Sequence, residues 1–186
     1  ATDGEKELTA YHMLTEYVKQ QNARARIFAV HRLDRDTSGV LVVAKNERIK
    51  KALQDNWAEL VTLRGYVAVI EGRLTKKSGT IQSWLKQTKT QLMYSTREPG
   101  DGLEAITEYT VIKENAKYSL LEIRLKTGRK NQIRVHMKDL GSNVVGDKKY
   151  GAKTNPLGRL GLHANVLEFR HPFSGEMMRF EAKTPV

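Results

Sequence analysis

Residues 29 to 46 read AVHRLDRDTSGVLVVAKN, and this stretch decides how the rest of the chain is interpreted. Apolar residues flank a run of charged residues, and a Thr-Ser-Gly turn ends at Gly39. Asp is a common turn residue because its carboxylate accepts hydrogen bonds from nearby backbone N–H groups, and Asp36, directly before the turn, fits that role. Asp34 is not needed for the turn. It is therefore either a second capping residue or a residue that carries chemistry.

The segments on both sides of this loop show helical and strand patterns. Helices are expected at residues 7–21, from residue 47 to residue 57 or 60, and at residues 130–140, the last ended by Gly141. Strands are expected at 40–45, 60–72, 79–87, 104–114 and 118–127, followed by a strand, a turn at 173–176 and a last strand. Because strands outnumber helices and mostly follow one another, the sequence predicts an α+β fold with a mixed, mostly antiparallel sheet.

Composition narrows the class of protein. The chain has 186 residues, enough for one domain with a sizeable core. Apolar runs are strand-sized, too short to span a membrane, and the first residues do not resemble a signal peptide. There is no cysteine, which excludes disulfides and thiolate metal sites and suits a reducing cytoplasm.

Charge points to a polyanionic partner. Thirty-two Lys and Arg residues against twenty-one Asp and Glu give a net charge of +11. Residues 73–97 contain six basic residues and no acidic one, with Trp84 and Tyr94 among them, and residues 124–153 contain nine basic residues. Basic tracts with aromatic side chains nearby favour nucleic acid over an anionic membrane. The alternative is a basic surface that binds nothing.

Three further features could carry chemistry. In TGRKNQIRVHMKDLG, residues 127–141, Arg134 lies between apolar residues, and a buried Arg needs a carboxylate partner. The alternative is an amphipathic helix with a solvated basic face. Tyr66 lies in an apolar strand and could be an ordinary core tyrosine. His163 and His171 do not have the spacing of metal ligands, so we expect no metal site and read both as structural or RNA-facing.

These segments, in this order, resemble the RluA-like pseudouridine synthases. The family signatures are HRLDxxTSG, YxAxxxG, TGRxHQIRVHxxxxGxPIxGDxxYG and LHAxxLxFxHPxxGE. Here they stand at His31–Gly39, Tyr66–Gly72, Thr127–Gly151 and Leu162–Glu176. The resemblance implies a pseudouridine synthase catalytic fold, with flanking helices and a central basic cleft.

The resemblance also implies roles for individual residues. Asp34 would be the catalytic aspartate, Tyr66 would stack on the target base, and Arg134 would hold Asp34 ionised. Three further residues would bind substrate: Ile133 as part of the apolar wall, Arg32 at the RNA around the extruded nucleotide, and Arg129. The implied reaction isomerises specific uridines in structured RNA, 23S rRNA first and tRNA second. We expect no cofactor, no metal and no membrane partner, and a monomer in the cytoplasm.

The chain departs from the family pattern in places. Asn131 replaces a His, and no Lys-Pro-x-Gly segment precedes the first helix. We therefore expect residues 1–186 to be a catalytic domain without that strand and without an upstream RNA-binding domain. Two other functions remain open: an RNA-binding module without catalysis, and a hydrolase that pairs Asp34 with His31 or His136.

Overall fold

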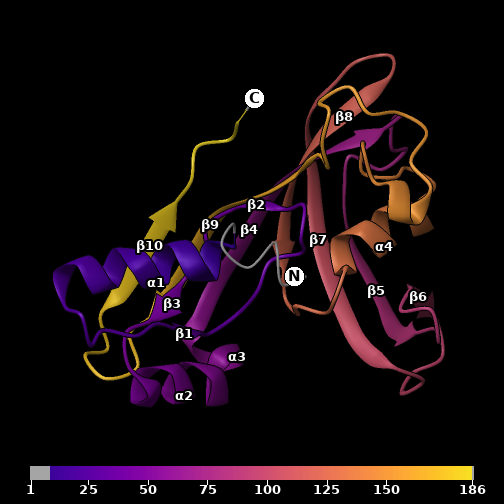
Figure 1. Ribbon diagram of the computed structural model, residues 1–186. Helices are drawn as coiled ribbons and strands as arrows, with labels where there is room; N and C mark the ends of the chain where they lie inside the picture. The colour runs from indigo at the N-terminus through magenta and orange to yellow at the C-terminus, as the bar shows by residue number, and fades with distance from the viewer. Residues whose placement is uncertain (1–8, 186) are drawn as a thin grey trace.

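The computed structural model describes residues 9–185, which form one eight-stranded sheet with helices packed against it (Figure 1). The strands run in the order β10-β9-β4-β8-β7-β5-β6, with β2 beside β9. Every neighbouring pair is antiparallel except β2 and β9. The bounds are β2 Ser38–Gly39, β4 Val61–Glu71, β5 Ser78–Gln87, β6 Met93–Thr96, β7 Leu103–Glu114, β8 Tyr118–Leu125, β9 Leu162–Arg170 and β10 Met177–Glu181. The predicted fold class is confirmed.

The helices are short. They are α1 Ala10–Gln21, α2 Glu47–Asp55, α3 Trp57–Leu60, α4 Gln132–Asp139 and the three-residue 3-10 helix η2 Lys148–Tyr150. The prediction of a first helix at 7–21 agrees with α1, although residues 7 and 8 lie outside the described residues. The predicted second helix is interrupted at Asn56, which ends α2 and precedes α3. A separate two-stranded sheet pairs β1 Phe28–Ala29 with β3 Val43–Ala44.

Figure 1 shows two halves joined by the long strands β4 and β9. One half contains α1, α2, α3, β1, β3 and β10, and its core gathers around Val30, Leu53, Leu167 and Phe169. The other half contains β5 to β8 and α4, with a core around Ile70, Leu121, Ile123 and Met137. The loop that carries Asp34 runs between β1 and β2, at the junction of the halves.

The prediction of a buried strand at residues 40–45 is wrong in length. Only Val43 and Ala44 pair as a strand, and Ala44 alone is fully buried among these six residues. The backbone N–H of Val42 donates instead to His31 Nε2 at 3.0 Å, and that of Val40 donates to Ala164 O at 2.8 Å. A strand can be only as long as the segment it pairs with, and β1 is two residues long. The apolar pattern of residues 40–45 does not show the length of that partner.

The Thr-Ser-Gly turn has a steric cause. Gly39 has φ +121°, and a Cβ atom there would lie 2.1 Å from Ala164 O on β9. Only glycine combines this backbone conformation with so close an approach. Ser38 and Gly39 therefore pair with His163 and Ala164, and this pairing holds the charged loop against the edge of the main sheet.

Helix α4 is not the amphipathic helix with a solvated basic face that was one alternative. Six of its eight residues are buried, and they include Gln132, Arg134 and His136. Gln132 ties the start of the helix to β7, since its amide donates to Ile106 O at 3.0 Å and Thr107 Oγ1 at 2.9 Å. The predicted end is correct: Gly141 follows in a left-handed conformation.

Candidate active site

Asp34 lines a cavity of about 390 Å³, called here the first cavity. Its side chain is about 20% exposed, and its carbonyl accepts a hydrogen bond from the Thr37 N–H at 2.9 Å, which closes the turn. The backbone carbonyl of Asp34, and not its carboxylate, therefore closes the turn. The apolar lining residues are Val30, Leu33, Trp57, Tyr66, Leu125, Ile133 and Leu162.

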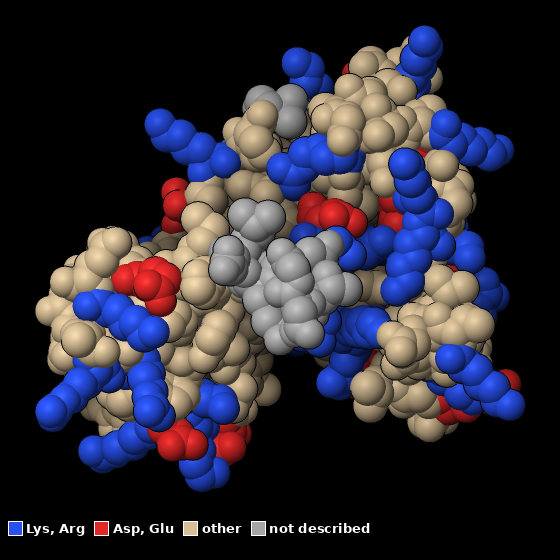
Figure 2. All heavy atoms as spheres, in the orientation of Figure 1, with Lys and Arg blue, Asp and Glu red and all other residues tan. Residues whose placement is uncertain are grey.

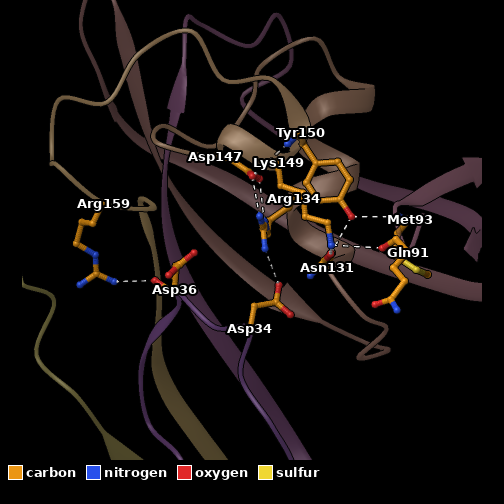
Figure 3. A network of polar contacts seen from close by, with 10 residues as sticks. All are labelled: Asp34, Asp36, Gln91, Met93, Asn131, Arg134, Asp147, Lys149, Tyr150 and Arg159. Carbon is orange, nitrogen blue, oxygen red and sulfur yellow. Dashed lines mark hydrogen bonds and ion pairs between the residues drawn. The ribbon is translucent and has the colours of Figure 1, made fainter. Parts of the chain in front are cut away.

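Arg134 contacts Asp34, but its closest partner is another carboxylate. Its Nη1 lies 3.5 Å from Asp34 Oδ2, within the distance over which opposite charges interact strongly. Its Nε and Nη2 donate to Asp147 at 2.9 Å and 2.7 Å, and Asp147 is 1% exposed (Figure 3). Arg134 also lies over the Tyr150 ring, 5.2 Å from its centre. The guanidinium is therefore held in place by Asp147 and Tyr150 and presents one remaining nitrogen to Asp34.

The pKa of Arg134 reflects this pairing. Burial by itself lowers the pKa of the guanidinium, but the hydrogen bonds and charge of Asp147, together with the charge of Asp34, raise it. Arg134 is thus positively charged between two carboxylates. Sequence reasoning missed Asp147, although it lies in the quoted GDxxYG segment. The available signal was that a buried guanidinium is planar and carries several N–H donors, so it can bind two carboxylates at once.

Tyr66 and Ile133 lie where the sequence predicted an apolar wall, because both line the first cavity. Tyr66 is on β4 at a register shift between β4 and β9, which falls between Gly65 and Val67. Such irregularities redirect side chains. Burial raises the pKa of Tyr66 and the nearby charge of Asp34 raises it further, while Arg64 opposes both. Tyr66 is therefore a neutral phenol at neutral pH.

Cations surround the mouth of the first cavity. Arg32 and Arg129 both line it and are exposed. Arg129 Nε donates to Glu104 O at 2.9 Å, which fixes its direction. Arg64, which sequence reasoning missed, also lines this cavity, and its guanidinium donates to Lys126 O at 2.8 Å. The missed signal was alternation: Arg64 stands two residues before Tyr66, so both point to one face of β4.

The two histidines considered as partners of Asp34, His31 and His136, both have lowered pKa values and hydrogen-bond partners of their own. Burial, and then the charge of Arg64, lower the pKa of His31 to about 4, and its Nε2 accepts the Val42 N–H. Burial lowers the pKa of His136 to about 4 as well, and both its ring nitrogens meet hydroxyls, those of Ser83 and Thr107.

His163 and His171 form hydrogen bonds within the fold. His163 bonds the Ser38 hydroxyl and Ala182 O, and the His171 ring accepts N–H groups of its own turn, from Phe173 and Ser174. Within residues 9–185, no three His, Cys, Asp or Glu side chains are grouped so as to hold a metal ion.

In Figure 2, Lys and Arg side chains lie around a group of Asp and Glu side chains near the centre of the face shown. They also lie over the half that contains α4. Not all of the predicted basic tract is free. Arg73 and Lys77 pair with Glu114, and Lys86 pairs with Asp101. In the described part of the chain, no helix has both the length and the apolar character needed to cross a membrane.

Known proteins match this chain over most of its length. Residues 2–139 match the family model described as RNA pseudouridylate synthase. The uncharacterized RNA pseudouridine synthase YlyB of Bacillus subtilis (strain 168) is 42% identical over 159 residues, covering 84% of this chain and 52% of that protein. Ribosomal large subunit pseudouridine synthase D of Xanthomonas campestris pv. campestris is 38% identical over 175 residues, covering 86% and 52%.

Solved structures agree with this assignment. Human RNA Pseudouridylate Synthase Domain Containing 1 has a TM-score of 0.74 and 26% identity, covering 92% of this chain and 74% of that chain. Human RNA Pseudouridylate Synthase Domain Containing 4, with a TM-score of 0.76 and 22% identity, shares the fold. The chain spans about half the length of the curated relatives named here. From its residues, its site and these matches, the chain belongs to the RNA pseudouridylate synthase family, as its resemblance to the RluA-like enzymes indicated.

Proposed function

We propose that this chain is the catalytic unit of an RNA pseudouridine synthase in which Asp34 is the catalytic aspartate. The observation that carries the proposal is the paired carboxylate: Asp34 faces a cavity with apolar walls, and Arg134 lies 3.5 Å behind it. A carboxylate in such a place loses solvation and tends to become neutral, and a nearby cation favours its charged form.

The reaction rearranges bonds without a redox change. The bond between uracil nitrogen 1 and ribose carbon 1′ breaks, the uracil turns, and carbon 5 bonds to carbon 1′ while it gives up its proton and nitrogen 1 gains one. An ionised carboxylate at the sugar can start this sequence either by attacking carbon 1′ or by removing a ribose proton. Tyr66 and Ile133 offer the detached base flat apolar contacts that allow rotation.

The proposed substrate is structured RNA, and its uridine must leave the base stack to reach Asp34, at a cost of a few kcal/mol. Contacts of Arg32 and Arg129 with RNA at the mouth of the cavity would offset that cost. Ribosomal RNA of the large subunit is the first candidate, because similar proteins are named ribosomal large subunit pseudouridine synthase D. Transfer RNA is the second. We propose a cytoplasmic monomer, in line with the lack of cysteine.

Two competing functions are less well supported. A hydrolase needs a second acid or base near Asp34, but both ring nitrogens of His136 bond hydroxyls and His31 Nε2 accepts the Val42 N–H. A binding module without catalysis gains nothing from a carboxylate in an apolar cavity, since it would repel phosphate.

Asp34→Asn tests the proposal, because it keeps the shape of the side chain and removes its charge. The variant is expected to fold, to bind RNA and to form no pseudouridine, which carbodiimide labelling detects after incubation with rRNA or tRNA lacking the modification. Asp55→Asn is the matched control, since Asp55 is an exposed residue of α2 paired with Lys51. Conversion at the wild-type rate by Asp34→Asn would exclude a catalytic role for this residue.

A further inference from the structure

A second cavity, of about 800 Å³, adjoins the first at Thr37, which lines both. Its lining differs sharply in charge from that of the first. The cationic residues that line it are Arg35, Arg134, Lys148, Lys149 and Arg159, and within the described residues the acidic lining is Asp36 alone. Apart from Arg134, no residue that lines this second cavity has a part in the reaction proposed above.

Arg159 is a half-buried cation held entirely by neutral acceptors. Its guanidinium donates to Ser38 Oγ at 2.7 Å, to Leu160 O at 3.2 Å and to Asp36 O at 3.4 Å, so it is fixed beside the turn (Figure 3). Among residues 9–185 it forms no ion pair with a carboxylate. A guanidinium partly removed from water and directed into a cavity is a ready site for an anion, because it offers planar donors without a competing charge.

The lysines of this cavity add charge that is not neutralised. Lys149 Nζ donates to Asn131 Oδ1 at 2.9 Å and to Gln91 O at 3.4 Å. Burial, and then the charges of Lys130 and Arg134, lower the pKa of Lys149, while the charges of Asp34 and Asp147 raise it. Lys148 is exposed and has no ion pair in the described part of the chain. A bound anion would relieve this repulsion.

The wall of the cavity is built by close contact of two loops. Gly146 has φ +73°, and a Cβ atom there would lie 2.2 Å from Arg159 O. Any larger residue would push Arg159 away from the turn. Beside it, the Thr37 hydroxyl oxygen is buried and finds no hydrogen-bond partner among the described residues. A donor group therefore lies where the two cavities meet.

We propose that the second cavity binds the phosphodiester next to the target uridine, with Arg159 as its main contact and Lys148 and Lys149 beside it. This inference rests on the proposed function. A uridine in the first cavity places its neighbouring phosphate close to the boundary at Thr37. The phosphodiester is a monoanion with two free oxygens, which a guanidinium binds with parallel hydrogen bonds.

The test compares Arg159→Gln with Arg170→Gln in the full chain. Arg170 is a matched control because its guanidinium also donates to a backbone carbonyl, Gly175 O, and it lies at the far end of β9, on the order of 25–30 Å away. The probe is a labelled oligouridylate of about fifteen nucleotides, which offers uridine in every register. Fluorescence anisotropy measured over a series of salt concentrations gives Kd and its salt dependence.

Loss of one phosphate contact on a single strand reduces the slope of log K against log salt by about 0.7. Arg159→Gln is expected to show that reduction and a Kd about five- to tenfold weaker at low salt, whereas Arg170→Gln should match the wild type. A neutral morpholino oligomer of the same sequence should not distinguish Arg159→Gln from wild type. An unchanged slope for Arg159→Gln, or an equal change for Arg170→Gln, would overturn the proposal.

Two further variants distinguish the loss of a phosphate contact from misfolding. Arg159→Lys keeps the charge, so the wild-type slope should persist although Kd weakens. Asp36→Asn removes the acidic lining residue and should tighten oligouridylate binding, an effect of opposite sign that a damaged fold would not produce. Weaker binding by Asp36→Asn would contradict an anion site.

Failure of this inference and failure of the proposed function give different results. If the wild type makes pseudouridine but the slope does not depend on Arg159, the second cavity is not a phosphate site and the catalytic proposal stands. If the slope depends on Arg159 but wild-type chain makes no pseudouridine from any RNA offered, the phosphate site stands and the catalytic proposal falls.

Discussion

The first and second cavities meet at a single turn and are lined by different kinds of side chain. Both are lined by arginines, but the first adds apolar and aromatic walls around one carboxylate, whereas the second has, among the described residues, five cationic lining residues and one acidic one. Arg134 lines the second cavity and reaches Asp34, which lines the first. The comparison teaches that the first cavity offers apolar contacts that suit a base, whereas the second offers mainly cationic contacts that suit an anion.

The largest effect is expected where the two cavities touch, at Arg134→Lys. Lysine keeps the charge, but one ammonium cannot donate to both carboxylates as the guanidinium does. We expect conversion to fall by about 10²–10³-fold, a loss usual for a misplaced electrostatic group, while RNA affinity changes little. The free energy of unfolding should fall by about 1–3 kcal/mol because buried Asp147 loses a hydrogen bond.

Single-turnover carbodiimide labelling, anisotropy and urea unfolding measure these three quantities for Arg134→Lys. Arg179→Lys is the control, since Arg179 pairs with Glu168 and Glu181 on the exposed face of β10. If Arg134→Lys converted RNA as fast as the wild type, the two cavities would not be coupled through this residue.

Changes at Tyr66 should affect the first cavity alone. Tyr66→Phe keeps the ring and removes a hydroxyl whose pKa is raised by burial. If the ring only stacks, much of the activity survives. If the hydroxyl assists loss of the carbon 5 proton, conversion falls by about 10²-fold or more and a product with the new carbon–carbon bond accumulates. Tyr66→Leu should be poor in both cases, because stacking contributes about 1–3 kcal/mol per base.

The measurement for Tyr66 is conversion rate together with Kd for RNA. If conversion falls while Kd for RNA is unchanged, Tyr66 acts in the first cavity alone. A loss of affinity that exceeds the loss of conversion would mean that Tyr66 belongs to the binding surface instead.

A smaller effect is expected from lysines outside both cavities. Lys76 and Lys89 are exposed and have no ion pair among residues 9–185, whereas Lys77 and Lys86 pair with Glu114 and Asp101. Gln at both unpaired positions should shallow the salt slope by up to about 1.8 for structured RNA, because each removed phosphate contact contributes about 0.7–0.9. Gln at the two paired positions should change the slope less. Equal changes would mean that net charge alone governs binding.

The smallest effect concerns stability against pH. The pKa of His31 and that of His136 are both lowered to about 4 in the folded protein, from 6.5. The unfolded chain therefore binds protons more readily, so the free energy of unfolding is highest above pH 6.5 and falls as the pH drops from 6.5 towards 4. For fully buried His136 the loss is at most about 3 kcal/mol, and it is less for partly exposed His31.

Urea unfolding at pH 7 and at pH 5 measures this dependence. His136→Gln should be less stable at pH 7, because the Ser83 and Thr107 hydroxyls lose partners, but it should lose less stability between the two pH values. A wild-type pH dependence in that variant would show that His136 does not titrate with unfolding.

Local pattern predicted most of the second half of the molecule. The strands at 60–72, 104–114 and 118–127 agree with β4, β7 and β8, because each has a long antiparallel partner in the sheet. The same approach failed at 40–45, where β1 is a partner only two residues long. It also missed the short strand β6.

The sequence by itself determined the family and the fold class, and it predicted Asp34, Tyr66 and Arg134 as residues of one site, because these depend on motifs that can be read along the chain. Tertiary structure alone decided that Arg134 contacts both Asp34 and Asp147, that Arg64 and Tyr66 line the same cavity, and that Lys148, Lys149 and Arg159 line another. The physical reason is that pairing and burial depend on distances between segments that lie far apart in sequence, and a residue's charge shows neither which partner reaches it nor whether any does.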